Sequence, residues 1–251
     1  FIFGGLILAA IALFLSLGVW QVQRLAWKTD LIARINARVH APAVTPPMDW
    51  GRVPISPQEN RKGRVPAPDD WGHFSKQADE YRHVTVRGHF LNAAEVQVYT
   101  LSDYGPGYWV MTPLKTDQGK IIYINRGFVP EDKKLPATRP EAQTNDEVTV
   151  TGLLRVPETK GWLFQQANDR KHNAWYHRDI AEMADMNVLG VVAPYFIDAD
   201  NTPNPGGWPK GGLTVIAFPN SHLTYALTWF SLAFMLIGVS VWLVWFRKAE
   251  E

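Results

Sequence analysis

The 251-residue chain contains no cysteine, and this absence removes several kinds of protein at once. Without thiols there is no disulfide framework, thiolate nucleophile, iron–sulfur cluster, cysteine-based zinc site or covalently attached c-type haem. The chain also lacks an excess of charge of either sign, since its formal net charge is +1. A nearly neutral chain has no bulk electrostatic attraction for nucleic acid, which we do not expect as a partner.

Sequence motifs of common enzyme sites are missing as well. The chain has no glycine-rich nucleotide loop, no HExxH and no GxSxG. His83 and His89 lie on one strand pattern, but about 20 Å of extended chain separates them, so we expect them to face solvent and not to share a metal ion. We therefore do not predict an enzyme.

Charge is also absent from both ends of the chain. Residues 1–20 and 225–246 contain no Asp, Glu, Lys or Arg. Each segment matches the roughly 20 apolar residues with which a helix crosses a hydrocarbon core. No small-x-small cleavage site follows the first segment, so we expect an uncleaved span and not a signal peptide. The second ends in an aromatic belt and a basic stop, namely Trp242, Trp245, Phe246, Arg247 and Lys248.

The sequence thus predicts two transmembrane helices, residues 1–23 and 222–247, around one domain at residues 24–221. Basic residues follow both spans, so the positive-inside rule leaves open which side of the membrane holds the domain. The chain begins at Phe1 without a methionine, and we expect further residues upstream.

Two segments of the domain precede its strands. Apolar residues recur at helical spacing over residues 24–40, which predicts that the first helix continues there. Residues 41–72 contain seven prolines, a density that excludes regular structure and favours an extended loop. We expect Trp50 and Trp71 to fasten this loop to the surface of the domain.

From residue 81 onward the apolar pattern has a period of two, which is typical of strands. The expected strands are residues 84–88, 95–99, 108–114, 120–125, 148–152 and 213–218, with a hairpin turn at 117–119. The first and fifth of these end in glycine, which we attribute to a β-bulge in each. One helix is expected after its capping residue Asp179, with Glu182 in a capping-box arrangement and Gly190 at its end. The fold class is therefore a membrane protein of α+β type, whose mostly antiparallel β domain, sheet or barrel, carries one or two helices.

One histidine stands at the edge of the second uncharged segment. Helical spacing places His222 on one stripe with Tyr225, Ala226 and Trp229. A neutral imidazole at the water–lipid boundary beside aromatic rings suits an axial ligand of haem iron. It equally suits an interfacial residue that only anchors the helix.

A second stripe lies at the end of the first span, where Trp20, Arg24 and Trp27 share a helix face. It is either an aromatic belt with one basic residue or a flat apolar wall whose guanidinium pairs with propionate carboxylates. If the two spans pack together, this stripe and His222 lie at the same depth in the membrane.

Four motifs follow one another along the whole chain, namely GVWQVQRLAWKTDLI at 18–32, YRHVTVRGHF at 81–90, GYWVMTPLKTDQGKIIYINRGFVP at 107–130 and NSHLTYALTWFSLA at 220–233. Together they resemble the Surfeit locus protein 1 family of cytochrome c oxidase assembly factors. The resemblance implies a role in maturing haem a–copper oxidases, with the domain outside the cytoplasm. It implies a bacterial inner membrane with the domain in the periplasm or, alternatively, the mitochondrial inner membrane.

The resemblance also assigns residues. The histidine of the family's HLxYAxTW motif, His222 here, is its proposed haem a ligand. Arg126 belongs to a segment that matches the family's NRG motif, and we interpret it as structural, propionate-pairing or partner-facing.

Our hypothesis is a haem a chaperone that binds its cargo transiently and non-covalently. It would receive haem a from haem a synthase and deliver it to subunit I of cytochrome c oxidase. The lipid bilayer is the third expected partner and would hold the chaperone, the synthase and subunit I. The alternatives are a scaffold that stabilises subunit I without touching haem, and a permanent accessory subunit of the oxidase.

Overall fold

The computed structural model describes residues 2–50, 72–158 and 166–249. Its contacts divide the chain into two compact units, a helical one (residues 1–37 with 216–251) and a β domain (residues 38–215). Each unit is described by itself below.

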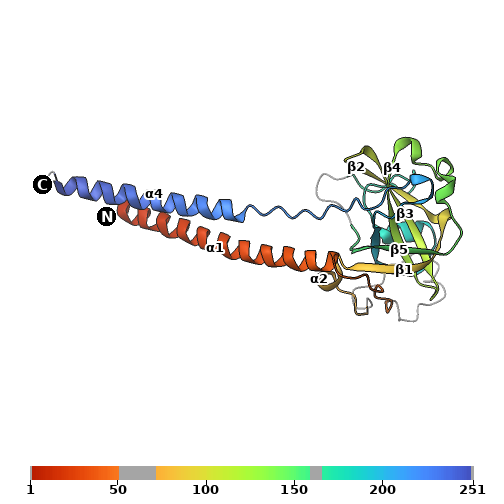
Figure 1. The fold of residues 1–251 in the computed structure, drawn as a ribbon. Coiled ribbons are helices and arrows are strands. Elements are labelled where there is room, and N and C mark those ends of the chain that lie inside the picture. The colour runs from red at the N-terminus through yellow and green to blue at the C-terminus, as the bar shows by residue number, and fades with distance from the viewer. Residues whose placement is uncertain (1, 51–71, 159–165, 250–251) are drawn as a thin grey trace. The chain divides into compact units, whose positions relative to one another are not determined.

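The helical unit consists of helix α1, Ile2–Val39, and helix α4, His222–Ala249 (Figure 1). By length and composition, Gly4–Val39 and His222–Phe246 are both able to cross a membrane. The fold class is confirmed, because two apolar terminal helices flank a strand-rich domain in the sequence. Helix α1 continues unbroken past the end of its uncharged segment, as predicted for residues 24–40.

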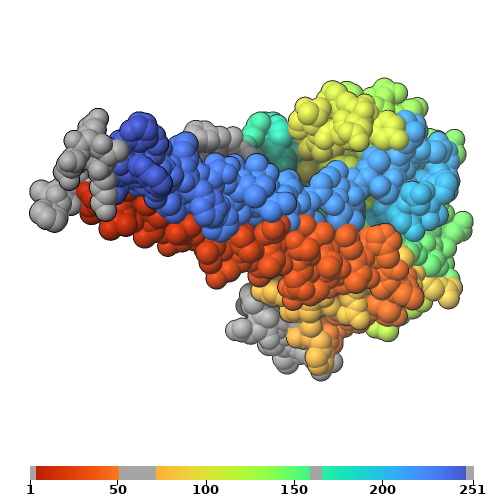
Figure 2. All heavy atoms as spheres, turned by 60° about the vertical axis from the view of Figure 1, so that its left-hand side comes forward, coloured from red at the N-terminus to blue at the C-terminus, as the bar shows by residue number. Residues whose placement is uncertain are grey.

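The two helices run antiparallel and in contact, as the adjoining red-orange and blue surfaces in Figure 2 show. Phe14 stacks on Trp229 with ring centroids 5.7 Å apart. Four residues further along α1, Gly18 lies under the ring of Phe230, where an added Cβ would be 2.5 Å from the nearest ring carbon. Glycine therefore lets the helices approach closely, as small residues do between membrane helices.

Three hydroxyl groups within these helices are satisfied locally. Ser16, Thr228 and Ser240 each donate to the backbone carbonyl four residues earlier, at 2.7, 2.9 and 2.6 Å. Such bonds suit a hydrocarbon environment, where no water satisfies a polar side chain.

In the described residues, the β domain contains six strands and two short α-helices. The strands are β1 His83–Phe90, β2 Val96–Ser102, β3 Gly105–Thr116, β4 Ile121–Pro130, β5 Val148–Arg155 and β6 Val192–Ala199. The α-helices are α2 Lys76–Asp79 and α3 Ile180–Met186. Single turns of 3₁₀-helix lie at Asn92–Ala94, Glu131–Lys133, Pro136–Thr138, Pro140–Ala142 and Pro205–Gly207.

Strand pairing closes the sheet into a barrel. The strand order is β1-β5-β6-β4-β3-β2, and β1 also pairs with β3. Strands β1, β5, β6, β4 and β3 thus form a ring, and β2 extends it as a hairpin with β3 (Figure 1). Among the six described strands, all pairs are antiparallel except β4 with β6. The prediction of a mostly antiparallel domain is therefore confirmed, and the pairing shows a barrel and not an open sheet.

The two strand-ending glycines have a different cause from the predicted bulge. At Gly88, β1 pairs with both β3 and β5, and at Gly152, β5 pairs with both β1 and β6. The β1–β5 pairing has a continuous register from His83 to Gly88, so it contains no bulge. An added Cβ would lie 2.8 Å from the carbonyl carbon of Lys115 at Gly88 and of Asp198 at Gly152. Close approach of a neighbouring backbone, not a bulge, therefore excludes side chains at both positions.

The core has two parts, one on each face of the sheet. Inside the barrel, aliphatic and aromatic side chains from β1, β3, β4, β5 and β6 pack with Trp50 and Phe74. On the outer face, α3 and Trp175 cover residues of β2, β3, β4 and β6. Trp50 is fully buried and belongs to the inner core, so it anchors its segment more deeply than the predicted attachment to the domain surface. Trp71 and most of the proline-rich segment lie outside the described residues.

The last strand was predicted wrongly. Residues 213–218 are described and contain no strand, while β6, which the period-two pattern did not indicate, is a central strand of the barrel. Buried on both faces, β6 has no alternation of apolar and polar residues, and it contains Pro194. Proline fits there because the β4–β6 register shifts between Val192 and Phe196, and β5 pairs only from Phe196 onward.

Helix α3 begins directly after its capping residue Asp179, as predicted. The Asp179 carboxylate accepts hydrogen bonds from the backbone N–H groups of Ala181 and Glu182, both at 3.1 Å. The Glu182 carboxylate instead accepts from Asn168, so the capping box is incomplete in the described contacts, and the helix ends at Met186, four residues before Gly190. Burial raises the pKa of Asp179 above its usual range, against the effect of these hydrogen bonds.

We expect Asp179→Asn to be at least as stable as wild type at pH 7, and Asp179→Ala to lose about 1 kcal/mol. Asparagine keeps the accepting oxygen and removes a buried charge. Because folding raises this pKa, the folded state binds the proton more tightly, and the cost of the carboxylate disappears as the pH falls below the unfolded pKa. Urea midpoints at pH 7 and pH 4 measure this. A stabilising effect of asparagine that is as large at pH 4 as at pH 7 would contradict the explanation.

Candidate functional site

A hydrogen bond between the two long helices forms the centre of the candidate site. His222 is the first residue of α4, and its Nδ1 lies 2.7 Å from Oε1 of Gln21 on α1. Gln21 is only 8 % exposed, although it lies on a helix with many exposed residues. Because Gln21 directly follows Trp20, this contact brings His222 to the level of Trp20 in the helix pair, as predicted if the two spans pack together.

The chemistry of this bond defines which nitrogen of His222 is available. An amide oxygen only accepts hydrogen bonds, so the imidazole Nδ1 carries the proton and donates it. In a neutral ring the lone pair is then on Nε2, on the other side of the imidazole. Among the described residues, no hydrogen-bond partner occupies Nε2. A metal ligand needs this arrangement, in which the nitrogen not bound to the protein faces the metal.

Aromatic rings flank this hydrogen bond. Trp20 and Tyr225 are each 53 % exposed, and Trp27 is 46 % exposed. The guanidinium carbon of Arg24 lies 3.9 Å from the centre of the Trp27 ring, which is a cation–π contact. Trp229 does not join this exposed group, because it is half-buried against Phe14.

Helical geometry puts the exposed rings on one side of the pair. On α1, Trp20, Arg24 and Trp27 are turned by roughly 100° from Gln21, toward one flank of the helix contact. On α4, Tyr225 is turned by about 60° from His222, and because α4 runs the opposite way it faces the same flank. The predicted stripe on α1 and the tyrosine of α4 thus share one surface beside the histidine.

Lys28 extends the positive charge of this surface by one turn. It follows Arg24 by four residues, and its ammonium lies 5.5 Å from the centre of the Phe218 ring. Two cations at this spacing on one helix, each against an aromatic ring, suit a ligand that is flat, apolar and doubly anionic at one edge.

Arg126 belongs to the β domain and not to the helical unit that contains the other predicted residues. It is 2 % exposed, its Nη2 donates to the carbonyl of Ala142 at 2.7 Å and to Asn204 at 3.1 Å, and the guanidinium lies over Phe90. Burial lowers the pKa of Arg126 to about 10, although the negative charge of Glu95 opposes this effect. Of the three predicted roles, this environment favours the structural one.

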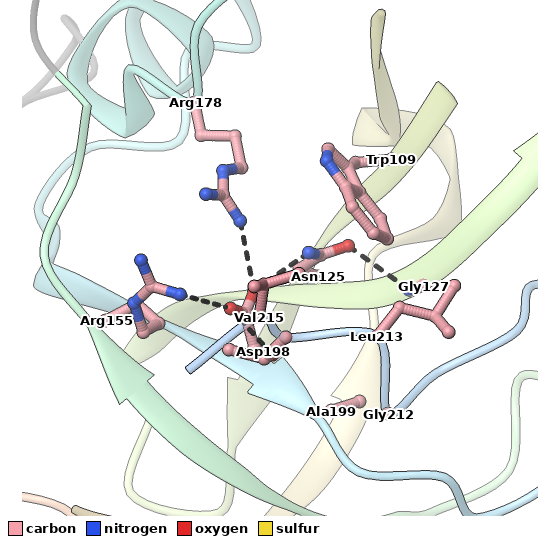
Figure 3. Close-up of a pocket in the computed structure, with 11 residues that line it drawn as sticks. Trp109, Asn125, Gly127, Arg155, Arg178, Asp198, Ala199, Gly212, Leu213 and Val215 are labelled. Atoms are coloured by element: carbon pink, nitrogen blue, oxygen red, sulfur yellow. Dashed lines mark hydrogen bonds and ion pairs between the residues drawn. The ribbon is translucent and has the colours of Figure 1, made fainter. Parts of the chain in front are cut away.

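The β domain has its own polar cluster around Asp198, beside a cavity of about 180 Å³ (Figure 3). Asn125 and Asp198 face each other in register across β4 and β6, and the Asn125 amide donates to the carboxylate at 2.8 Å. The other donors are Arg155 at 3.0 Å, Arg178 at 3.3 Å and Thr214 at 3.0 Å. Four donors occupy the acceptor positions of one carboxylate, so Asp198 is not available as a base or ligand.

The charges in this cluster balance. Burial alone would lower the pKa of Arg178, but Asp198 and Glu158 outweigh it and hold the pKa above its ordinary value. Burial would likewise raise the pKa of Glu158, yet the hydrogen bond from Arg178 lowers it. Two arginines and two carboxylates leave no net charge for a ligand. The cluster fastens the end of β5 and the Arg178 segment to β6, and we assign it a structural role.

Sequence reasoning missed Gln21 and the residues of the Asp198 cluster. Gln21 was visible only as a polar residue directly after an uncharged segment, and the sequence does not distinguish it from Gln23. Asp198 was visible as an acid that ends an apolar run, but the strand containing it was not predicted, so its partners could not be assigned.

Comparisons with known proteins give one consistent family. The sequence model of the SURF1 family matches residues 8–234. Surfeit locus protein 1 of Xenopus tropicalis is 34 % identical over 90 % of this chain and 70 % of that protein, and that of Homo sapiens is 34 % identical over 93 % and 73 %. The SURF1-like protein of Drosophila melanogaster is 30 % identical over 93 % and 73 %. The family match begins in α1, includes the whole β domain and ends in α4.

Proposed function

The chain belongs to the SURF1 family of cytochrome c oxidase assembly factors, and we propose that its task in this assembly is to carry haem a. In this proposal the protein takes haem a from haem a synthase and passes it to oxidase subunit I, and the β domain lies on the outer side of the membrane. A bacterial inner membrane, with the domain in the periplasm, is the location that we propose.

One observation carries the proposal. His222 Nδ1 lies 2.7 Å from Gln21 Oε1, which can only accept, so in the neutral ring the lone pair is on Nε2, at the N-terminal end of α4. Haem iron takes one imidazole nitrogen as an axial ligand, and Nε2 meets this requirement. The cargo would be held by one coordinate bond and without a thioether, since the chain has no cysteine, so it is able to leave.

The surrounding residues support the same ligand. Trp20, Trp27 and Tyr225 would cover the apolar face of a porphyrin, and Arg24 would pair with a propionate. Trp229, stacked on Phe14, would act by holding the helices together.

We expect His222→Ala to purify without the haem a that accompanies wild type when both are co-expressed with haem a synthase. The measurement is the visible spectrum per mole of protein in mild detergent. His89→Ala is the matched control, because His89 is an exposed histidine of β1 and its loss should leave the spectrum unchanged. Equal haem in His222→Ala and wild type would remove His222 from the site. Absence of haem from all three proteins would favour a scaffold or an accessory subunit.

A further inference from the structure

We infer that Gln21 is a positioning residue for His222, which sets the imidazole tautomer and keeps the histidine a ligand that can release its cargo. This inference rests on the proposed function. Its physical basis is the hydrogen bond of 2.7 Å between His222 Nδ1 and Gln21 Oε1.

The position of Gln21 indicates that the bond is built into the helix contact. Gln21 is three residues after Gly18, on the face of α1 that meets α4, and its side chain is nearly inaccessible to solvent. The hydroxyls of Ser16, Thr228 and Ser240 bond to the backbone of their own helix, whereas the Gln21 amide reaches the other helix. A buried amide keeps its partner, because an unsatisfied polar group costs about 1–3 kcal/mol.

The bond selects one tautomer of the ligand. With Nδ1–H directed at Gln21, the lone pair of Nε2 points away from α1 and is ready for iron without a proton transfer. If the amide were replaced by an apolar side chain, the ring would be free to rotate and to place its proton on Nε2. Outer partners of this kind typically change metal affinity by about 10–100-fold.

The acceptor's charge sets the strength of the ligand. A carboxylate in this position would draw the Nδ1 proton more strongly and make the histidine more basic, which strengthens the bond to the metal. An amide oxygen orients the ring and leaves it less basic. A carrier that must pass on its cargo needs this weaker ligand, because a lower affinity permits faster release.

Three variants of the full chain, purified with haem a, test the inference. We expect Gln21→Leu to bind haem a about 10–100-fold more weakly than wild type. Gln23→Leu, two residues along and exposed, is the matched control and should bind normally. Gln21→Glu should keep the cargo, release it more slowly to an apoglobin acceptor, and shift the reduction potential to a more negative value.

A spectroscopic readout separates positioning from helix packing. The iron–histidine stretching band of the reduced protein should move to higher frequency in Gln21→Glu, which retains a hydrogen-bond acceptor of the same reach. If Gln21 served only to hold α1 against α4, that band and the potential would remain at their wild-type values, and the inference would be overturned.

The failure of this inference is distinguishable from the failure of the proposed function. If His222→Ala loses haem while both Gln21 variants match wild type, His222 is the ligand and Gln21 does not position it. If His222→Ala retains haem, the proposed function itself is wrong. If Gln21→Leu does not accumulate, the Gln21→Glu band and potential decide the question.

Discussion

Replacing Asp198 by alanine is expected to lower the free energy of unfolding of the β domain by about 3–5 kcal/mol. The carboxylate is 4 % exposed and accepts from Asn125, Arg155, Arg178 and Thr214. Its removal leaves two guanidinium groups partly buried without their shared anion, which costs more than the lost hydrogen bonds. The urea midpoint of the full chain in mild detergent, followed by pulse proteolysis, measures the effect.

The control for this prediction is Asp132→Ala, an exposed acid in a 3₁₀ turn, which should change the midpoint by less than about 0.5 kcal/mol. The double variant Asp198→Ala with Arg155→Met should be less destabilised than the sum of its single changes, because the second change removes the guanidinium that the loss of Asp198 leaves without its ion-pair partner. Additive losses would show that the two groups do not share one charge network.

The strands with one solvent-facing side could be predicted from the sequence. Alternation in residues 84–88 and 148–152 identified β1 and β5, because their outward positions are polar and their inward positions apolar. Strand β6 shows no such alternation, because both of its faces are buried. It also contains Pro194, which argues against a central strand when only the sequence is known. The prediction of a strand at residues 213–218 was wrong for the opposite reason. Their apolar pattern fits a strand, but they do not pair with a neighbouring strand.

The sequence directed attention to residues at the ends of the two apolar segments and not to the buried Gln21 between them. His222, Trp20, Arg24 and Trp27 are recognisable because aromatic and basic residues gather where an apolar segment ends. Gln21 could not be singled out, because its importance comes from the packing of α1 on α4, which fixes the residue that faces the histidine. The role of Arg126 depended likewise on burial, which a strand motif alone does not reveal.

Gly152→Ala is expected to destabilise the β domain by about 3 kcal/mol, as a steric conflict with backbone atoms does. The new methyl carbon would lie 2.8 Å from the carbonyl carbon of Asp198 and 2.9 Å from the Cα of Ala199, and neither backbone atom can turn aside as a side chain does. Gly119→Ala is the matched control, because Gly119 has open space around it and a φ of +74°. This substitution should therefore cost only the strain of a left-handed backbone, about 1–2 kcal/mol.

The same substitution should also weaken the Asp198 cluster. Gly152 pairs with Ala199 across β5 and β6, and Arg155, three residues further along β5, donates to Asp198 at 3.0 Å. Pushing β5 away from β6 therefore lengthens this contact, and the losses from Gly152→Ala and Asp198→Ala should not add. A double variant that loses the full sum in urea would mean that the glycine and the carboxylate stabilise the barrel independently.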